Sequence, residues 1–287
     1  MKSVTVIIPT LNGEEKIELI LKSLKEQTKQ PLEIIIVDSS STDKTVELAR
    51  KEGAKIISIA RDSFNHGETR NLAAKESKGD YLLYMTQDAI PYDIYTIENL
   101  LSGITENKEV VASFAQQIAN PYSTEREKLI RAYNYPSESK IKSMDDATEL
   151  GIKTYFLSDV CAMYEKQTFF KLNGFEAPIE PNEDMHIASK ILRLGKKIRY
   201  EENAKVYNSH DSSFKEIFIR NDLIGKFVKK YKDDFPHSAT NKEGMNLVKK
   251  VTSQLFQKGL IGECILFWIE CGIKLFGNLA GKLTSVR

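Results

Sequence analysis

Short runs of β-branched and aliphatic residues alternate with amphipathic stretches over the first 90 residues of the chain. The apolar runs have the length of buried strands and cover residues 4–9, 34–38, 54–59 and 81–85. The stretches between them have helical spacing of apolar positions and cover residues 14–26, 43–51 and 68–77. This alternation predicts βα units and a parallel sheet with right-handed crossovers. Ser41 or Thr42 is the expected N-cap of the second helix.

After residue 90 the pattern is less regular. It predicts further strands over residues 110–119, 156–164 and 197–209, and a helix over residues 183–194. Residues 120–155 are rich in Pro, Ser, Glu and Lys, which indicates a mobile or partly helical loop region. From residue 214 the pattern is helical, with a break near residues 233–240. We therefore expect an α/β unit over residues 1–212 and a helical region over residues 213–287.

The last helical stretch, residues 260–280, is strongly apolar but contains a few polar residues. Glu263, Glu270 and Lys274 interrupt it, so we do not expect it to span a membrane. Together with Asn278 they share one narrow face of the helix. The wide apolar arc that remains must be covered by the body of the protein, by a second subunit or by a membrane surface.

Composition adds few constraints. The chain of 287 residues is 41% hydrophobic and 28% charged, as in soluble globular proteins, and its net charge of +1 gives no sign of nucleic-acid binding. From Lys215 onward, 13 Lys and Arg face 7 Asp and Glu, which suits either a surface for anionic lipid or phosphate or a solvated helical surface. The three cysteines have no metal-type spacing, and no secretory leader follows Met1, which favours a reducing compartment.

Acidic residues stand where two predicted inner strands end. Asp38 follows the apolar run at 34–37, and Asp88 closely follows the run at 81–85. Ligands bind at this carboxyl edge in open α/β sheets. Asp38 suits the donors of a nucleotide base or ribose. Asp88 suits Mg²⁺ or Mn²⁺ shared with a diphosphate, although capping of the turn before Pro91 explains it equally well.

Three further polar clusters have both a structural and a functional interpretation. His66 and Arg70 stand at a predicted helix start, which attracts phosphate, but such segments are more often simple caps. Glu183 and Asp184 also begin a helix, where the dipole favours carboxylates, or where one of them could act as a general base. His210 at a strand end could serve a metal or a diphosphate, or be structural.

In order and spacing these motifs resemble the inverting family 2 glycosyltransferases. The residues that carry the resemblance are 9–14, 37–43, Arg70-Asn71, Gly79-Asp80, Asp88, Gly174-Phe175 and Glu183-Asp184. The resemblance implies the GT-A fold, an α/β architecture with a mostly parallel central sheet, followed here by a C-terminal helical appendage. The chain contains neither GxGxxG after its first strand nor GxxxxGK[ST], which argues against dinucleotide and P-loop enzymes.

The resemblance also implies roles for individual residues. Asp184 matches the catalytic base and Glu183 an acceptor-binding position, while Asp88 and His210 match positions at the metal. The donor-binding positions are Pro9, Thr10, Asn12, Glu14, Asp38, Ser40, His66, Arg70 and Gln87. The metal motif of the family is Asp-X-Asp. In this chain its first two positions are Thr86 and Gln87, so Asp88 is the one carboxylate of the motif that remains.

Residues 64–71 and 86–89 are most similar to the rhamnosyltransferase branch of the family. This implies a dTDP-β-L-rhamnose donor, a lipid-linked saccharide acceptor, and a cytoplasmic enzyme peripheral to the plasma membrane, with a homodimer as a further option. A UDP-linked hexose or N-acetylhexosamine donor and a non-catalytic nucleotide-sugar-binding protein remain alternatives. The absence of Gln-X-X-Arg-Trp argues against a processive polymerase, and the lack of a cation at residues 10–15 argues against a nucleotidyltransferase.

Overall fold

The computed structural model describes residues 2–179, 181–209, 212–236 and 241–284. Within these residues, nine strands form one mixed sheet in the order β3-β2-β1-β4-β8-β6-β9-β5, with β7 paired to β9. The strands are β1 (Val4–Thr10), β2 (Glu33–Asp38), β3 (Lys55–Ser58), β4 (Tyr81–Met85), β5 (Ile90–Pro91), β6 (Val110–Ile118), β7 (Lys140–Lys142), β8 (Cys161–Glu165) and β9 (Lys197–Tyr207). The α/β architecture expected from the sequence is confirmed.

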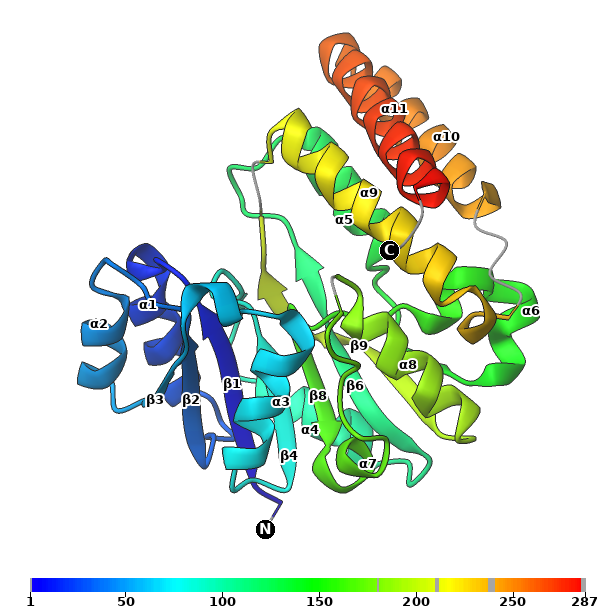
Figure 1. The fold of residues 1–287 in the computed structure, drawn as a ribbon. Coiled ribbons are helices and arrows are strands. Elements are labelled where there is room, and N and C mark those ends of the chain that lie inside the picture. The colour runs from blue at the N-terminus through cyan, green and yellow to red at the C-terminus, as the bar shows by residue number, and fades with distance from the viewer. Residues whose placement is uncertain (1, 180, 210–211, 237–240, 285–287) are drawn as a thin grey trace.

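The first four strands form one parallel block of the sheet. β1 lies between β2 and β4, and β3 pairs with β2, all in parallel. The apolar residues of β1, β2 and β4 are buried on both faces, as is usual where helices cover a parallel sheet, and those of the edge strand β3 are half-buried. Their carboxyl ends therefore lie on one side of the molecule, the upper side in Figure 1, away from the N-terminus.

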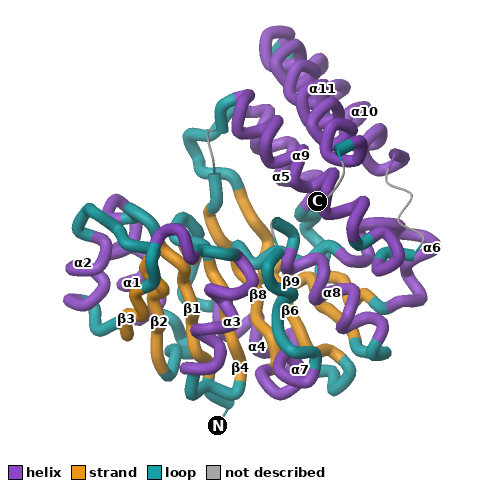
Figure 2. The backbone as a smooth tube through the Cα atoms, viewed as in Figure 1, coloured by secondary structure: helices purple, strands orange, loops and turns teal. Residues whose placement is uncertain are grey.

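Helices cover both faces of the sheet. One hydrophobic cluster contains residues of α1 (Glu14–Lys25), α2 (Thr45–Lys51) and α4 (Thr96–Thr105). The cluster on the other face contains residues of α3 (His66–Glu76), α7 (Lys166–Lys171) and α8 (Glu183–Arg193). Figure 2 shows this three-layer arrangement of helices and strands. The sheet thus fixes α3 and α8 on the same face, which matters for the site.

Residues 120–155 are more ordered than the sequence predicted. They form α5 (Glu125–Asn134), β7, α6 (Ala147–Leu150) and two 3-10 turns. The partly helical character that the sequence predicted is confirmed, but the sequence did not locate α5, because its apolar side, Leu129 and Ile130, packs on the C-terminal helices more than 100 residues away. The expected strand over 156–164 begins only at Cys161, so residues 158–160 form a loop at the upper edge of the sheet.

The C-terminal region consists of α9 (Phe214–Lys230), α10 (Asn241–Gln257) and α11 (Ile261–Leu283). They stand above the carboxyl edge of the sheet together with α5 (Figure 1). α11 packs along α9 through small residues. A Cβ added at Gly277 would lie 2.7 Å from the carbonyl oxygen of Phe218, and one at Gly281 would clash with that of Asp222. The two backbones can approach this closely only because these positions are glycine.

In the described part of the chain, α11 is the one helix long and apolar enough to cross a membrane. Its 23 residues include a window with a mean hydropathy of 1.4, of which 22% is buried. The sequence-based expectation that the charged residues exclude a span was too strict, because a window beginning after Glu263 holds only Glu270 and Lys274. Length and composition alone therefore leave the relation of α11 to a membrane open.

Candidate active site

Asp38 ends β2 and lies under the loop that follows. Its carboxylate accepts hydrogen bonds from the Thr10 hydroxyl (3.2 Å), the Ser41 amide (2.9 Å) and the Ser41 hydroxyl (2.5 Å). Its side chain is buried, and Pro9 pairs with Val37 on the neighbouring strand. Asp38 thus organises the loop at the predicted nucleoside pocket, and direct contact of its carboxylate with a base stays a prediction.

Asn12 and Glu14 join the loop after β1 to the loop after β2. The Asn12 side-chain oxygen accepts from the Thr42 amide (2.9 Å), and the Glu14 carboxylate accepts from the Lys44 amide (2.9 Å). Ser40, at a positive φ of 64°, donates its hydroxyl to the carbonyl of Ile59 (2.9 Å). These residues come together at the carboxyl edge, as predicted from their strands.

The predicted N-cap of α2 was wrong. The helix begins at Thr45 after Lys44, which provides no side-chain cap. Ser41 is engaged by Asp38 and Thr42 by Asn12, while Asp43 accepts from the Thr45 amide (3.0 Å). The hydrogen bonds of Ser41 with Asp38 and of Thr42 with Asn12 therefore take the place of capping at the start of α2.

Gln87 fixes the loop after β4 against the loop after β1. Its side-chain amide accepts from the Leu11 amide (2.8 Å) and donates to the Leu11 carbonyl (3.0 Å). A Cβ added at Gly13 would lie 2.8 Å from the Gln87 Oε1 atom, so a larger residue there would displace the Gln87 side chain. The Thr86 hydroxyl is buried and has no hydrogen-bond partner among the described residues. Gln87 stands at the variable middle position of the family's metal motif, and its side chain binds the backbone of the loop after β1.

Asp88 is half-buried at the same edge of the sheet. Thr86, two residues before it, donates its amide to the carbonyl of Val160 (3.2 Å), which places this loop next to the loop before β8. Among the described residues no group of three or more His, Cys, Asp or Glu side chains forms a metal cluster. His210, the second predicted metal ligand, lies outside the described residues.

The first turn of α3 is capped by the chain itself. The Asn65 side chain accepts from the amides of Gly67 (3.0 Å) and Glu68 (3.2 Å), and its own amide group donates to the carbonyl of Ile179 (3.1 Å). The capping interpretation of this segment is therefore confirmed, and these amides are not available to a phosphate. His66 follows at the first position of α3 and is half-exposed.

Arg70 is buried between two carboxylates. Its Nη1 atom lies 3.1 Å from Glu183 Oε1, and its Nε atom lies 3.6 Å from Asp159 Oδ2. Arg70 is 4% exposed, and Asp159 also accepts from the Tyr164 hydroxyl (2.6 Å). Burial raises the pKa of Asp159 well above its usual value, with Arg70 opposing the shift. The structure places Arg70 and Glu183 in a buried ion pair next to Asp184. Their contacts with donor and acceptor stay predictions.

Asp184 lies one residue further along α8 and is less buried than Glu183. Its carboxylate accepts from the Met185 amide (2.7 Å), and the Asp159 amide lies 3.4 Å from its Oδ2 atom. Burial, followed by the charge of Glu183, raises the pKa of Asp184 to about 7. A carboxylate with this pKa can accept a proton near neutral pH, as a general base must.

Asp184 opens onto a cavity of about 690 Å³ between the sheet edge and the C-terminal helices. Its lining comes from the loop before β8, the start of α8, and the helices α5, α9 and α11. Phe156, Leu157 and Ile224 contribute apolar surface, while Arg131 and Arg220 contribute charge. The cavity has the size of a site for a small saccharide.

Several residues of the cavity were missed by sequence reasoning. Asp159 was placed inside a predicted strand, although it lies in the loop before β8. Asn182, at a φ of 72°, begins α8 in the left-handed conformation. The side-chain amide nitrogens of Asn182 and Asn208 are buried without a hydrogen-bond partner in the described ranges. Only the antiparallel pairing of β8 with β4 brings Asp159 to this edge, and no local pattern reports that pairing.

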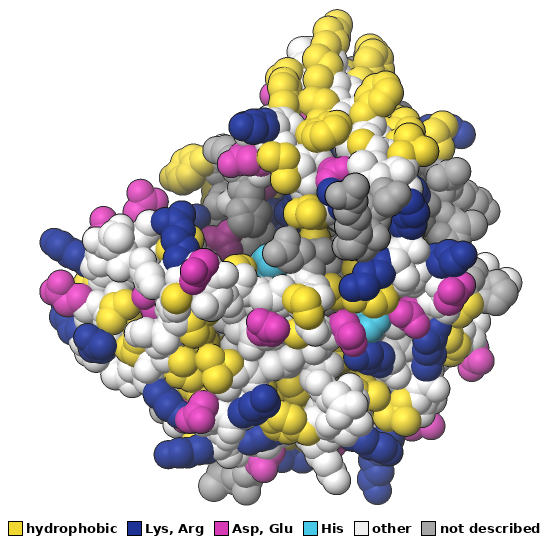
Figure 3. Space-filling model, viewed as in Figure 1, with side chains coloured by type: hydrophobic (Ala, Val, Ile, Leu, Met, Phe, Trp, Pro, Cys, Tyr) yellow, Lys and Arg dark blue, Asp and Glu magenta, His cyan; other side chains and the backbone are white. Residues whose placement is uncertain are grey.

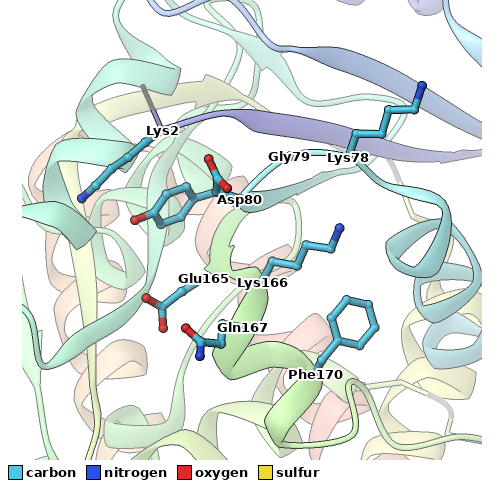
Figure 4. Close-up of a pocket in the computed structure, with 9 residues that line it drawn as sticks. Lys2, Lys78, Gly79, Asp80, Glu165, Lys166, Gln167 and Phe170 are labelled. Atoms are coloured by element: carbon cyan, nitrogen blue, oxygen red, sulfur yellow. The ribbon is translucent and has the colours of Figure 1, made fainter.

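A second pocket of about 570 Å³ lies at the opposite edge of the sheet. It is lined by Lys78, Asp80 and Lys166 among others, around the start of β4 and the end of β8 (Figure 4). The Asp80 carboxylate accepts from the Ser3 amide (2.8 Å), and Lys166 donates to the Ser77 carbonyl (2.6 Å). Both groups serve the fold, and none of the sequence-predicted site residues lies in this pocket.

Comparisons with known proteins agree with this arrangement. The family model described as glycosyl transferase family 2 matches residues 5–172. The O-antigen chain rhamnosyltransferase WbaN of Salmonella anatum is 38% identical over 226 residues, which are 77% of this chain and 70% of that protein. The O-antigen chain rhamnosyltransferase RfbN of Salmonella typhimurium is 38% identical over 223 residues, 76% of this chain and 69% of that protein.

Solved structures share the fold at low sequence identity. The mannosyltransferase PcManGT of Pyrobaculum calidifontis, in complex with GDP-Man and Mn²⁺, has a TM-score of 0.69 at 16% identity, covering 99% of this chain and 88% of that one. TarS 1-349 of S. aureus, in complex with UDP-GlcNAc, has a TM-score of 0.59 at 17% identity, covering 98% and 90%. By its sequence family and its GT-A fold, the chain belongs to glycosyl transferase family 2 and is a glycosyltransferase.

Proposed function

We propose that this enzyme transfers L-rhamnose from dTDP-β-L-rhamnose to a hydroxyl of a lipid-linked saccharide during synthesis of a bacterial surface polysaccharide. The observation that carries the proposal is the position of Asp184, a carboxylate with a pKa raised to about 7 at the mouth of a saccharide-sized cavity. The choice of rhamnose rests on the 38% identity to two O-antigen rhamnosyltransferases.

The proposed reaction is one in-line displacement at the anomeric carbon. The acceptor oxygen attacks from the face opposite the diphosphate, the bond to the diphosphate breaks, and Asp184 takes the proton of the hydroxyl. Attack from the opposite face turns the β-linked donor into an α-L-rhamnoside. The Asp159 and Met185 amides hold the Asp184 carboxylate in place, and the buried Arg70 keeps the local charge balanced.

The residues present fit a divalent cation held mainly by substrate. Asp88 supplies carboxylate oxygens, the ligands that Mg²⁺ and Mn²⁺ prefer, and the donor diphosphate and water would complete the shell. His210, outside the described residues, remains a proposed second ligand. Such an ion would stabilise the negative charge of the departing diphosphate.

A transfer assay tests both donor and base. We expect nucleoside diphosphate release with dTDP-rhamnose to exceed that with UDP-glucose, UDP-N-acetylglucosamine and GDP-mannose. Asp184→Asn should reduce turnover by about 10²–10⁴-fold while the donor still raises the melting temperature. Wild-type turnover in the Asn variant would refute the base assignment, and a clear preference for another nucleotide sugar would refute the donor.

We also infer that the enzyme works at the inner surface of the plasma membrane. Large apolar side chains of α11 are exposed, among them Phe276 at 68% and Leu275 at 59%. Figure 3 shows apolar side chains gathered over the part of the molecule where α10 and α11 lie, with Lys or Arg side chains near them. Apolar helix faces flanked by lysines bind anionic bilayers.

Liposome flotation tests this proposal. Wild-type protein should float with vesicles that contain phosphatidylglycerol, and less so as salt increases. Equal recovery in the soluble fraction with and without vesicles would contradict it. A concentration-dependent dimer that buries the same face would assign α11 to a subunit interface instead.

A further inference from the structure

Strand β7 places its charged and apolar side chains in the reverse of the usual order. Ile141 is 37% exposed, whereas its neighbour Lys142 is 5% exposed and pairs with the buried Ile198 of β9. In a strand that covers a core, the apolar side chain is expected inside and the lysine outside. A departure from the local pattern is expected where a residue serves the function of the protein. Folding alone therefore does not account for Lys142.

The Lys142 ammonium is surrounded by aromatic rings and carbonyl groups. Its Nζ atom lies 5.0 Å from the centre of the Phe114 ring and 6.0 Å from that of Phe156. No carboxylate in the part of the chain that the structure describes forms an ion pair with it. Burial lowers the pKa of Lys142 to about 7, and the charge of Asp146 opposes this shift. A buried lysine without a close counter-ion destabilises a fold.

Lys142 binds the backbone just before β8. Its Nζ atom donates to the carbonyl of Lys153 (3.1 Å), in the 3-10 turn η3 (Gly151–Tyr155), and to the carbonyl of Phe156, which follows this turn. An ammonium and a neutral amine can both donate to two carbonyls, so these contacts do not depend on the charge of Lys142. From Phe156 the chain reaches β8 through residues outside any helix or strand. Lys142 thus fixes the start of an irregular segment, residues 156–160.

This segment contacts the reaction centre further along. Residues 156–158 line the cavity in front of Asp184. The Asp159 amide lies 3.4 Å from the Asp184 Oδ2 atom, and its hydrogen bond is one of the interactions that lower the pKa of Asp184. Lys142 itself is outside the cavity lining, so its connection to the base is indirect and runs through this segment.

We propose that Lys142 is a positioning residue for the transfer reaction: by binding the carbonyls of Lys153 and Phe156, it holds residues 156–160 so that the Asp159 amide faces the Asp184 carboxylate. The inference rests on the proposed role of Asp184 as the base and deepens it. The unfavourable burial of a lysine in β7 is then offset by a base that is held by this segment as well as by α8. A methionine could fill the same space but has no hydrogen to donate to the segment.

The proposal predicts a change in the titration of Asp184. A hydrogen bond to a carboxylate favours its charged form, so loosening of the segment by Lys142→Met should raise the pKa of Asp184 above about 7. Glu183 on α8 and Arg70 on α3 also act on this carboxylate, and Asp159 interacts with it. Further charged side chains line the cavity from α5, α9 and α11, among them Glu127, Arg131, Glu216, Arg220, Glu270 and Lys274. None of these side chains lies on β7, so Lys142→Met leaves their charges unchanged.

The pH profile of transfer tests the proposal. We would measure nucleoside diphosphate release from dTDP-rhamnose, with methyl hexosides or water as acceptors. The wild-type kcat/KM should rise through about pH 7, and the midpoint in Lys142→Met should lie up to about one unit higher. The plateau should fall about tenfold, because the base is held less well. The donor should still raise the melting temperature of the variant, since the predicted nucleoside pocket follows β1 and β2.

Lys140→Met is the matched control, because it removes a charge from an exposed position of the same strand. Its midpoint should equal that of wild type. Lys142→Arg keeps donors for both carbonyls and should return the midpoint to the wild-type value. A midpoint does not depend on the amount of folded enzyme. An unchanged midpoint in Lys142→Met would therefore overturn the proposal even if rate or stability falls, and so would an equal shift in Lys140→Met or in Lys142→Arg.

Asp184→Asn, measured alongside, separates failure of this inference from failure of the proposed function. If the Asn variant keeps the wild-type rise with pH, the base assignment is wrong and the role of Lys142 falls with it. If the Asn variant loses the rise while Lys142→Met keeps the wild-type midpoint, only the inference about Lys142 fails. Should another nucleotide sugar be the better donor, the profiles are measured with that donor, and the expected shift is the same.

Discussion

Helices α8 and α11 place their charges in opposite ways. In α8 the apolar residues Ile187, Ile191 and Leu192 are buried against the sheet. In α11 the charged Glu263 and Glu270 point inward to Arg126 of α5, while Trp268, Leu275 and Phe276 are exposed. The first arrangement is usual for a helix that packs on a sheet, and the second leaves an apolar face exposed on the outer side of the helix.

The same contrast holds for the ion pairs of the two regions. Arg70 is enclosed with Glu183 and Asp159 next to Asp184, whereas Arg126 and its two glutamates retain some contact with solvent. The buried charges of the α/β region are therefore stabilised by one another and not by water. Charges in the helical region can still be solvated by water, so their loss should be tolerated better.

Removal of the buried cation should have the largest effect. We expect Arg70→Met to lower the free energy of unfolding by about 3–5 kcal/mol, because two buried carboxylates lose their counter-charge. Arg126→Met is the matched variant in the helical region and should cost about 1–2 kcal/mol. Urea denaturation of the two variants measures the difference between their free energies of unfolding. Equal losses would contradict the distinction between buried and solvated ion pairs.

Close packing between α9 and α11 should give the next effect. Gly281→Ala would add a methyl group against the carbonyl of Asp222, and we expect a loss of about 1–3 kcal/mol. Gly272→Ala on the same helix meets nothing within 4 Å and should stabilise by up to about 1 kcal/mol through helix propensity. Thermal unfolding compares them, and a harmless Gly281→Ala would show that the two helices do not pack as described.

The pH dependence of transfer tests the α/β region, which contains Asp184, and not the C-terminal helices. Because the pKa of Asp184 is raised to about 7 and the base must be deprotonated, kcat/KM should rise with pH through about 7. Burial is the main cause and the charge of Glu183 the second, so Glu183→Gln should move this rise to lower pH. Profiles normalised to their plateau remove any effect of reduced folding. An unchanged rise would mean that another group titrates.

The outer face of α11 should give the smallest effect on stability. Phe276→Ser changes a side chain that is 68% exposed, so the free energy of unfolding should change by less than about 0.5 kcal/mol while vesicle binding weakens. Phe267→Ser, on the same helix but 1% exposed, should instead cost about 3–5 kcal/mol. Similar losses in both variants would place Phe276 in a packed interface.

Sequence reasoning succeeded where a pattern is local. The runs over residues 4–9, 34–38 and 81–85 predict strands because β-branched and aliphatic residues buried on both faces leave a clear signal. It did not locate α5, because the burial of this helix depends on α10 and α11. It also misplaced the N-cap of α2, because the Ser41 hydroxyl donates to Asp38 and the Thr42 amide donates to Asn12. Asp184 could be singled out from its motif, but Asp159 and Asn208 could not, because strand pairing alone brings them to it.

The cavity walls and the base belong to different parts of the chain. Asp184 is fixed by the sheet through α8 and the left-handed Asn182, whereas α5, α9 and α11 enclose the space in front of it. The carboxylate and the walls of the space in front of it are therefore built by separate segments of the chain. We expect that exchange of the three helices between related enzymes changes the shape of this space while Asp184 keeps its position.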